Sequence, residues 1–171
     1  NRDFTAALAE SVKHSVISGE SLLAWHEQNA QSILRRDAVC MMELIRRNCE
    51  TKAAIVAADE RERAVSGAGR AVLNFGHTIG HALEAASGYA LRHGEAVSLG
   101  MIGEMELAVQ CSGFSNTERL RVERLMESLG LPHDVAVERR ERFREHDEHM
   151  LREQHLVYDD EAALIASSQQ A

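Results

Sequence analysis

The sequence predicts an all-α fold, and three observations support this. Apolar residues recur at spacings of three and four over long stretches, which is the period of an amphipathic helix. Pro132 is the single proline in 171 residues, so long helices can run without interruption. No stretch shows the strict alternation of a strand, and no glycine-rich nucleotide fingerprint or internal repeat is present. A chain of this length can bury a real core.

Each helix is predicted from its periodicity and its end signals. The first covers residues 5–18 and ends near Gly19, and the second begins at Ser21 as its cap and runs to 36. The third follows an Asp37 cap and runs to 59, and residues 63–69 form a turn or loop. A fourth covers about 70–87 with a break at Ser87–Gly88, a fifth covers about 94–111, and a sixth covers 116–129 before Gly130.

The chain divides into two parts of one domain. Residues 1–133 form a helical domain, and residues 134–171 form a charged helical tail with a thin apolar stripe. The sequence starts at Asn1 rather than Met and enters directly into a helix, so we expect a piece of a longer protein.

Composition excludes several classes of partner. A hydrophobic fraction of 44% and a charged fraction of 27% are typical of a soluble globular protein. The net charge of −8 argues against a nucleic-acid surface. There is no long apolar run and no signal peptide, so we expect a cytoplasmic protein without a membrane partner. Three cysteines without CxxC spacing indicate free buried thiols.

A polar stripe is predicted along the fourth helix. Its members follow spacings of four and three residues: Arg70, Asn74, His77, His81 and Glu84. The stripe could be the solvated face of an ordinary amphipathic helix, but Asn and His are poor helix formers. Gly76 and Gly80 each cost about 1 kcal/mol relative to alanine inside a helix, which indicates a close backbone approach. A cation, an amide and two imidazoles suit an anionic ligand or a metal.

A metal site becomes more plausible with His93, which precedes another helix. Zinc takes neutral imidazole nitrogens and carboxylate oxygens, and a catalytic site uses three protein ligands. Two histidines therefore need a carboxylate, and spacing leaves four candidates open: Glu10, Glu62, Glu84 and Glu95. The HExxH pattern is absent, because residue 78 is Thr.

The stretch RAVLNFGHTIGHALEAASGYALRHGEAVSLGM, residues 70–101, resembles the signature of the 3-dehydroquinate synthase family, the sugar-phosphate cyclases. Upstream, CETKAAIVAADERE (49–62) and ALAESVK (7–13) resemble two further family segments, with Ser11 standing where Val is usual. The resemblance covers about residues 1–132. It implies the helical C-terminal metal-binding domain of such an enzyme, without the N-terminal α/β domain that carries NAD.

The resemblance also implies residue roles. Glu10, His77 and His93 would be the ligands of a zinc or cobalt ion. Asn74 and His81 would contact the substrate phosphate, and Lys13, Lys52 and Arg70 would hold its carboxylate and hydroxyls, with Lys13, Lys52 and His81 as catalytic residues. The implied reaction converts 3-deoxy-arabino-heptulosonate 7-phosphate to 3-dehydroquinate and phosphate in the shikimate pathway. NAD would bind the missing domain, a homodimer is expected, and this chain alone is expected to be inactive.

Two departures from the family pattern leave alternatives open. The link between Glu62 and Arg70 is longer than usual, and the tail lacks the family's lysine-rich motif and any lysine at all. One alternative is a related sugar-phosphate cyclase of secondary metabolism. Another is a non-catalytic helical remnant or partner-binding module, in which Glu10, His77 and His93 would not converge. Glu10 and Lys13 could then be an ordinary surface ion pair.

Overall fold

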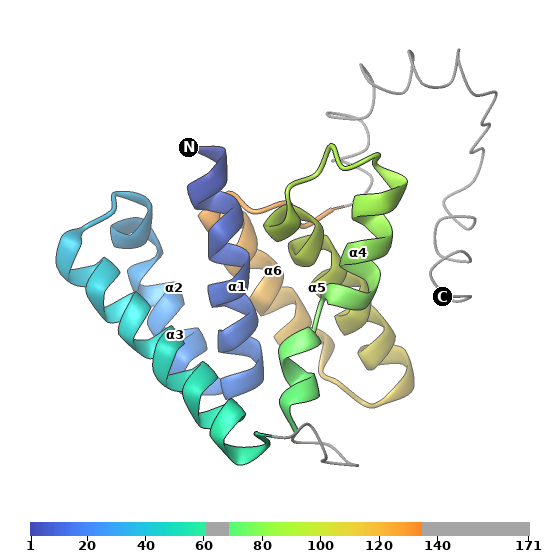
Figure 1. Ribbon diagram of the computed structural model, residues 1–171, viewed down its shortest axis with the longest axis horizontal. Coiled ribbons are helices and arrows are strands. Elements are labelled where there is room, and N and C mark those ends of the chain that lie inside the picture. Colours follow the sequence, from blue (N-terminus) through green and yellow to red (C-terminus); the bar gives the residue numbers. More distant parts are fainter. Residues whose placement is uncertain (61–68, 135–171) are drawn as a thin grey trace.

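The computed structural model describes residues 1–60 and 69–134, which form an all-α fold as predicted (Figure 1). Within these ranges there is no strand. The elements are α1 (Arg2–Ser18), α2 (Glu20–Leu34), α3 (Ala38–Ala58), the short 3-10 helix η1 (Arg70–Asn74), α4 (His77–Ala86), α5 (His93–Cys111) and α6 (Asn116–Leu129). The predicted loop at 63–69, apart from Gly69, and the predicted tail from 135 onward lie outside the described residues.

Capping residues set most helix boundaries. Asp37 caps α3 by accepting a hydrogen bond from the Cys40 amide, as predicted. Gly130, with a φ of 74°, ends α6, also as predicted. The prediction that Ser21 caps the second helix is wrong, because α2 already begins at Glu20. Gly19, with a φ of 91°, both ends α1 and caps α2, so that the chain turns through a single residue.

The predicted continuous helix over 70–87 is also wrong. Arg70–Asn74 form the 3-10 helix η1, and α4 begins only at His77. Between them Gly76 has a φ of 80°, a left-handed conformation that breaks the helix. A β-carbon on Gly76 would lie 2.5 Å from Cγ of Met101 on α5, so only glycine fits this position. Arg70 and Asn74 therefore do not share a helical face with His77 and His81.

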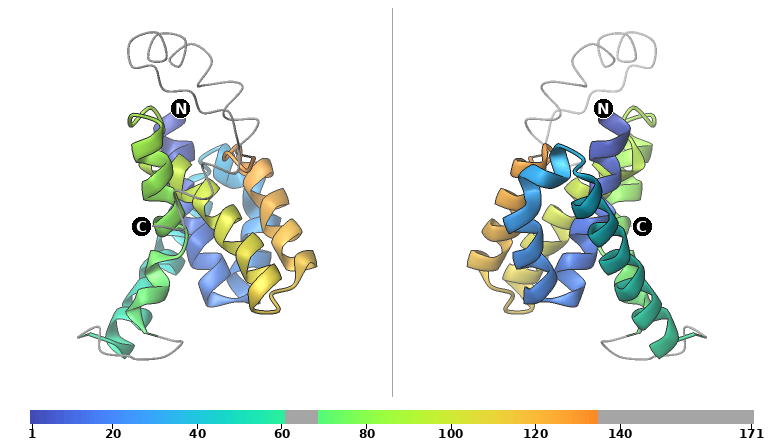
Figure 2. Two further views of the ribbon diagram at one scale, coloured as in Figure 1. Left: turned by 90° about the vertical axis from the view of Figure 1, so that its right-hand side faces the viewer. Right: turned by 90° about the vertical axis from the view of Figure 1, so that its left-hand side faces the viewer.

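Helix α1 runs through the middle of the bundle, with α2 and α3 on one side, α4 and α5 on the other, and α6 behind (Figure 1). The side views show the lower end of α3 next to η1 (Figure 2), where the Arg70 amide donates to the Asp59 carboxylate. The main core is aliphatic and rich in methionine, with Val12, Ile33, Val97, Met101 and Met126 among its most buried members. Burial of these side chains is the main driving force for packing.

Glycines let the helices that carry the site approach closely. A β-carbon on Gly100 of α5 would lie 2.0 Å from the Gly76 carbonyl oxygen, and one on Gly80 would lie 3.1 Å from the Ala96 carbonyl oxygen. Similarly, a β-carbon on Gly94 would lie 1.9 Å from the Ala6 carbonyl oxygen on α1. The close approach expected from Gly76 and Gly80 is thus confirmed, and it locks the N-terminal ends of α4 and α5 onto their neighbours.

The expectation that all three cysteines are buried needs correction. Only Cys40 is buried, whereas Cys49 and Cys111 are exposed because they lie on outer helix faces. Met42 of α3 is 74% exposed. Trp25 does pack against the main core, and the Arg47 guanidinium lies over its ring. Among the described residues, none of the helices has the length and apolarity needed to cross a membrane.

Candidate metal centre

Three helices bring one side chain each to a common point. Glu10 lies in the middle of α1, while His77 and His93 are the first residues of α4 and α5. One ligand atom from each lies within 4.8 Å of the other two. The alternative of a non-catalytic remnant predicted that these side chains would not converge, and the structure brings them together.

The distances suit a small cation. Oε1 of Glu10 lies 3.6 Å from Nε2 of His77 and 4.0 Å from Nε2 of His93. Ligand atoms at about 2.1 Å from a tetrahedral zinc ion lie roughly 3.4 Å from each other. Both distances from Oε1 of Glu10 lie within about 0.6 Å of this value, so small side-chain movements would let the carboxylate share one ion with either imidazole.

Hydrogen bonds fix which ring nitrogen of each histidine faces this point. Nδ1 of His77 lies 3.2 Å from the Phe75 carbonyl oxygen, and Nδ1 of His93 lies 3.3 Å from Oε1 of Glu84. A carbonyl and a carboxylate oxygen only accept, so both Nδ1 atoms carry the proton and donate. In the neutral rings both Nε2 atoms then present lone pairs toward Glu10. Metal-bound histidines are held in the same way by an oxygen behind the ring.

The carboxylate between these rings has an unsatisfied oxygen. Oε1 of Glu10 is buried and accepts no hydrogen bond. Three acceptor atoms, this oxygen and two Nε2 atoms, face one another without a donor between them. Burial lowers the pKa of His77, and the nearby Lys13 cation lowers it further. The hydrogen bond to the Phe75 carbonyl acts in the opposite direction but does not outweigh them. A bound cation would satisfy all three atoms, so these residues fit a metal ion.

Lys13 holds the other oxygen of Glu10. Its Nζ lies 2.7 Å from Oε2 of Glu10, and the lysine is only 3% exposed, so this is not an ordinary surface ion pair. Burial acts to raise the pKa of Glu10, but the hydrogen bond and charge of Lys13 outweigh it, and the pKa lies below its usual range. The carboxylate is thus ionised and oriented, with Oε1 left for the imidazoles.

The other candidate carboxylates have different partners. Glu95 is buried and binds the Arg2 guanidinium through both oxygens, and it also accepts from the Arg92 amide, which caps α5. Glu84 accepts from His93 and therefore orients a candidate ligand, although His81, Glu84 and His93 also form a second group whose potential ligand atoms lie within 4.8 Å of one another. Glu62 lies outside the described residues. Glu10 is the carboxylate that joins both His77 and His93.

The other predicted site residues lie on neighbouring elements. His81 is exposed one turn after His77, with ring centroids 5.5 Å apart. Asn74 is exposed at the end of η1, and Arg70 is half-buried at its start. Lys52 is exposed on α3, and no described carboxylate lies within ion-pair distance of it. The ligand atoms, two lysines and an arginine thus come from five different elements.

A hollow of about 460 Å³ lies beside the ligand cluster rather than at it. Its walls are mostly apolar, and they include Asn74 and Glu104 but none of Glu10, His77 and His93. Glu104 is a residue that the sequence analysis missed. It accepts a hydrogen bond from the Gly76 amide at 2.9 Å and so holds the turn that precedes His77. No pattern marks it in the sequence, because its partner is a backbone group.

Comparisons with known proteins agree with the resemblance. The family model for the 3-dehydroquinate synthase C-terminal domain matches residues 7–155. The chain is 42% identical over 131 residues to the 3-dehydroquinate synthase of Acetivibrio thermocellus, covering 77% of this chain and 35% of that protein. It is 39% identical over 145 residues to the one of Geobacter sp. strain M21, covering 84% and 39%. The enzyme of Pseudomonas entomophila is 42% identical over 132 residues, covering 77% and 35%.

Proposed function

Because the chain belongs to the 3-dehydroquinate synthase family through its C-terminal domain, we propose that it forms the metal- and substrate-binding part of such an enzyme. The chain spans little more than a third of the length of the relatives it matches. The proposal for the whole protein is the conversion of 3-deoxy-arabino-heptulosonate 7-phosphate to 3-dehydroquinate and phosphate. Its main support is the convergence of Glu10, His77 and His93 around a buried oxygen that lacks a donor.

In this proposal Glu10, His77 and His93 hold a zinc or cobalt ion. Three protein ligands leave a coordination position open for substrate. A bound ion would supply Lewis-acid chemistry toward a substrate hydroxyl. Lys13 keeps Glu10 ionised, and Phe75 and Glu84 keep the two rings in the tautomer that binds through Nε2.

Cationic side chains around the centre bind the acidic groups of the substrate. Lys13, Lys52 and Arg70 come from α1, α3 and η1, and a keto-acid phosphate carries negative charge at both ends. An arginine can bind a carboxylate or phosphate through two parallel hydrogen bonds, and a lysine acts as a compact charge. Lys13 and Lys52 hold the reacting part of the molecule in position.

His81 and Asn74 contact the phosphate group. His81 lies 5.5 Å from His77 and 5.9 Å from His93 between ring centroids, and it is exposed, so its ring can exchange a proton with a ligand beside the metal. The Asn74 amide donates to a phosphate oxygen. Loss of phosphate needs a proton to leave the neighbouring carbon, and His81 assists this transfer together with the leaving phosphate.

NAD is the proposed hydride carrier, and its binding site is assigned to the other part of the full-length protein. The described helices contain no glycine-rich turn between a strand and a helix, which is the usual dinucleotide site. A homodimer is proposed on the resemblance alone. The chain by itself is expected to bind metal without turnover.

A fusion protein tests the proposal. The chain is joined to the N-terminal part of the Acetivibrio thermocellus relative, and phosphate release from the heptulosonate phosphate is measured with zinc and NAD. We expect release that needs both additions and is lost in the His77→Ala variant. A folded, zinc-binding fusion that releases no phosphate contradicts the proposal, as does NAD-dependent turnover by the 171-residue chain alone. A panel of other sugar phosphates tests the related-cyclase alternative.

A further inference from the structure

A second set of buried polar side chains lies on α1 behind the metal centre. Ser11, His14 and Ser15 are buried there. Ser11 and Ser15 contact His26 of α2, which is completely inaccessible to solvent, and His14 contacts Asn48 of α3. None of them is used by the proposed function. Buried polar groups are costly unless each finds a hydrogen-bond partner, so the directions of these bonds can be worked out.

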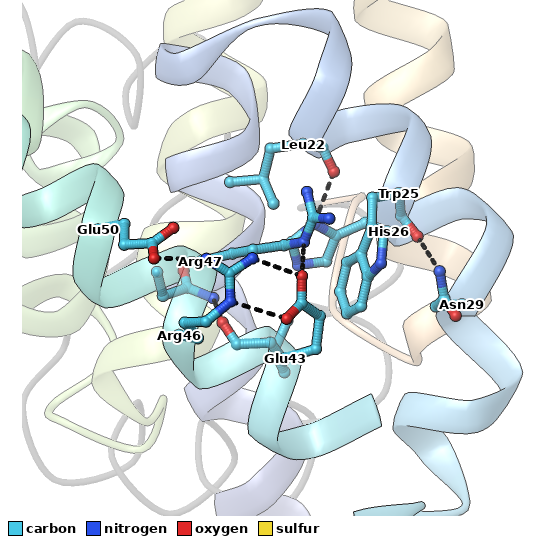
Figure 3. Close-up of polar contacts among 10 residues, drawn as sticks. Leu22, Trp25, His26, Asn29, Glu43, Arg46, Arg47 and Glu50 are labelled. Atoms are coloured by element: carbon cyan, nitrogen blue, oxygen red, sulfur yellow. Dashed lines mark hydrogen bonds and ion pairs between the residues drawn. The ribbon is translucent and has the colours of Figure 1, made fainter. Parts of the chain in front are cut away.

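The chain of hydrogen bonds begins at His26. Its Nδ1 lies 3.0 Å from the Leu22 carbonyl oxygen, which can only accept, so Nδ1 carries the proton (Figure 3). Nδ1 also lies 2.8 Å from the Ser15 hydroxyl, which itself donates to the Ser11 carbonyl oxygen. Nε2 of the neutral ring is therefore an acceptor. The Ser11 hydroxyl, 2.7 Å away, donates to it.

The same logic continues through Asn48 of α3. Its Nδ2 donates to the Leu44 carbonyl oxygen at 2.8 Å and to the Ser11 hydroxyl oxygen at 2.7 Å, which fixes the orientation of the amide. Oδ1 of Asn48 is then the atom that faces His14. Nδ1 of His14 lies 2.6 Å from it and must donate. Every bond in the chain thus points the same way, from His14 through Asn48 and Ser11 to His26 and Leu22.

This series of hydrogen bonds leaves one acceptor atom of His14 without a partner among the described residues. With the proton on Nδ1, Nε2 of the neutral ring carries a lone pair, and no described residue hydrogen-bonds to it. His14 follows Glu10 by four residues, so the two side chains lie on the same face of α1, and the charges of Glu10 and Lys13 both act on the His14 ring. Burial lowers the pKa of His14, and the charges of Lys13 and Lys52 also lower it. The hydrogen bond to Asn48 raises the pKa but does not outweigh these effects.

We propose that His14 is a further substrate-contacting residue of this site, in which Nε2 accepts a hydrogen bond from a hydroxyl group of the sugar phosphate. This inference rests on the proposed function. Lys13 and Lys52 can only donate, so they suit the carboxylate and phosphate oxygens. A neutral Nε2 can only accept, and the hydroxyl groups are the donors that this class of substrate offers. Asn48 holds the ring in the accepting tautomer.

Two variants of the zinc-loaded 171-residue chain separate contact from folding. His14→Asn keeps an amide that can donate to Asn48 but lacks an atom at the Nε2 position. His14→Gln places an amide oxygen near that position. We expect the dissociation constant of the heptulosonate phosphate, measured by calorimetry, to rise about 10-fold in His14→Asn, the effect of one neutral hydrogen bond. His14→Gln should stay within about 3-fold of the wild type.

Zinc affinity and the thermal unfolding midpoint are measured beside these constants and should be unchanged in both variants. Nitrogen NMR of the wild-type ring gives an independent readout that needs no substitution. It should show a protonated Nδ1 and an unprotonated Nε2 in the free chain, and the Nε2 signal should shift when substrate is added.

Three results overturn the inference. One is equal substrate binding by the wild type and His14→Asn, which leaves the proposed function intact. Another is a His14 ring protonated on Nε2 in the free chain. The third is a zinc-loaded wild-type chain that does not bind the substrate at millimolar concentration. Phosphate release by the fusion protein then decides the proposed function separately.

Discussion

Two regions of this molecule use histidine in opposite ways. At the metal centre, Nε2 of His77 and Nε2 of His93 face a carboxylate oxygen of Glu10 that also lacks a donor. In the bundle interior, Nε2 of His26 receives the Ser11 hydroxyl at 2.7 Å. In all three rings Nδ1 lies beside an oxygen that can accept its proton. The two regions therefore differ at the second nitrogen.

This difference separates a structural histidine from a candidate ligand better than burial does. A satisfied Nε2 leaves nothing for a ligand to complete, whereas three facing acceptors are unstable together until a cation or proton arrives. His26 thus supports the packing of α1 against α2, and His77 and His93 form a site that still needs a partner. His14 resembles His77 and His93 in this respect, because its Nδ1 is bound and no described residue hydrogen-bonds to its Nε2, although it belongs to the interior hydrogen-bond network.

The largest expected effect is on metal binding. His77→Ala and His93→Ala should each weaken zinc binding by more than about 100-fold, since a direct ligand matters more than the groups that orient it. Ser11→Ala, in the interior chain, should leave zinc affinity unchanged. Isothermal titration of the purified chain with zinc measures all three. Equal affinities across the set would mean that zinc binds elsewhere.

The next effect concerns stability, and here the larger change is expected from the interior histidine and the smaller one from the metal centre. His26→Leu should lower the free energy of unfolding of the zinc-free chain by about 2–3 kcal/mol, because Ser11 and Ser15 lose a buried partner. His77→Leu should change it by less than about 0.5 kcal/mol, since the zinc-free site gains nothing from that ring. Urea unfolding provides the values. A larger loss in His77→Leu would show that the empty centre already stabilises the fold.

A smaller effect tests the group behind a ligand. Glu84→Gln should weaken zinc binding about 10-fold, because a neutral amide oxygen is a poorer acceptor for the Nδ1 proton of His93 than a carboxylate. Glu127→Gln, an exposed change on α6, is the matched control. Competition with a chromophoric chelator resolves differences of this size. Identical zinc affinities for the two variants would show that Glu84 does not contribute to zinc binding.

The smallest effect is a dependence on pH. The folded pKa of His26 is lowered from 6.5, chiefly by burial, so the folded state binds this proton less readily than the unfolded state. The contribution of His26 to the free energy of unfolding is therefore fully present above about pH 6.5, and it is lost as the pH decreases toward the folded pKa. We expect a loss of up to about 1 kcal/mol between pH 7.5 and 5.5 from this group, measured by urea unfolding of the zinc-free chain. The loss should shrink in His26→Leu, and an unchanged slope there would assign it to other groups.

The helices were largely predictable, and the breaks between them less so. Periodicity and the Asp37 cap are local signals, and both survive in the fold. The break at Gly76 depends on Met101 and Val97 of another helix, so no local pattern reveals it. The same holds for the site. Composition and spacing left four carboxylates open, and the selection of Glu10 came from the family resemblance.

The interior polar chain could not be predicted at all. Ser11 was noticed only as a departure from the usual residue, and nothing nearby in sequence identifies Asn48 as its partner. The pairing depends on α1 and α3 meeting in space, across 37 positions of the chain. The direction of each hydrogen bond was also unpredictable, because it depends on whether the partner in space is a group that can only accept.

The ion pair between Lys13 and Glu10 has a consequence for electrostatics. The lysine cancels the charge of the carboxylate, and imidazoles that coordinate a metal are neutral, so the four side chains would carry no net charge beside a bound ion. The site with a bound divalent cation would therefore carry a net charge of about +2, because the four side chains do not neutralise the ion. The cation would be held by the coordinating atoms of Glu10, His77 and His93, and its surplus positive charge would attract a multiply charged anion. Replacing Lys13 by a neutral residue would therefore weaken the attraction for the anion, and it would also remove the cation that keeps Glu10 ionised.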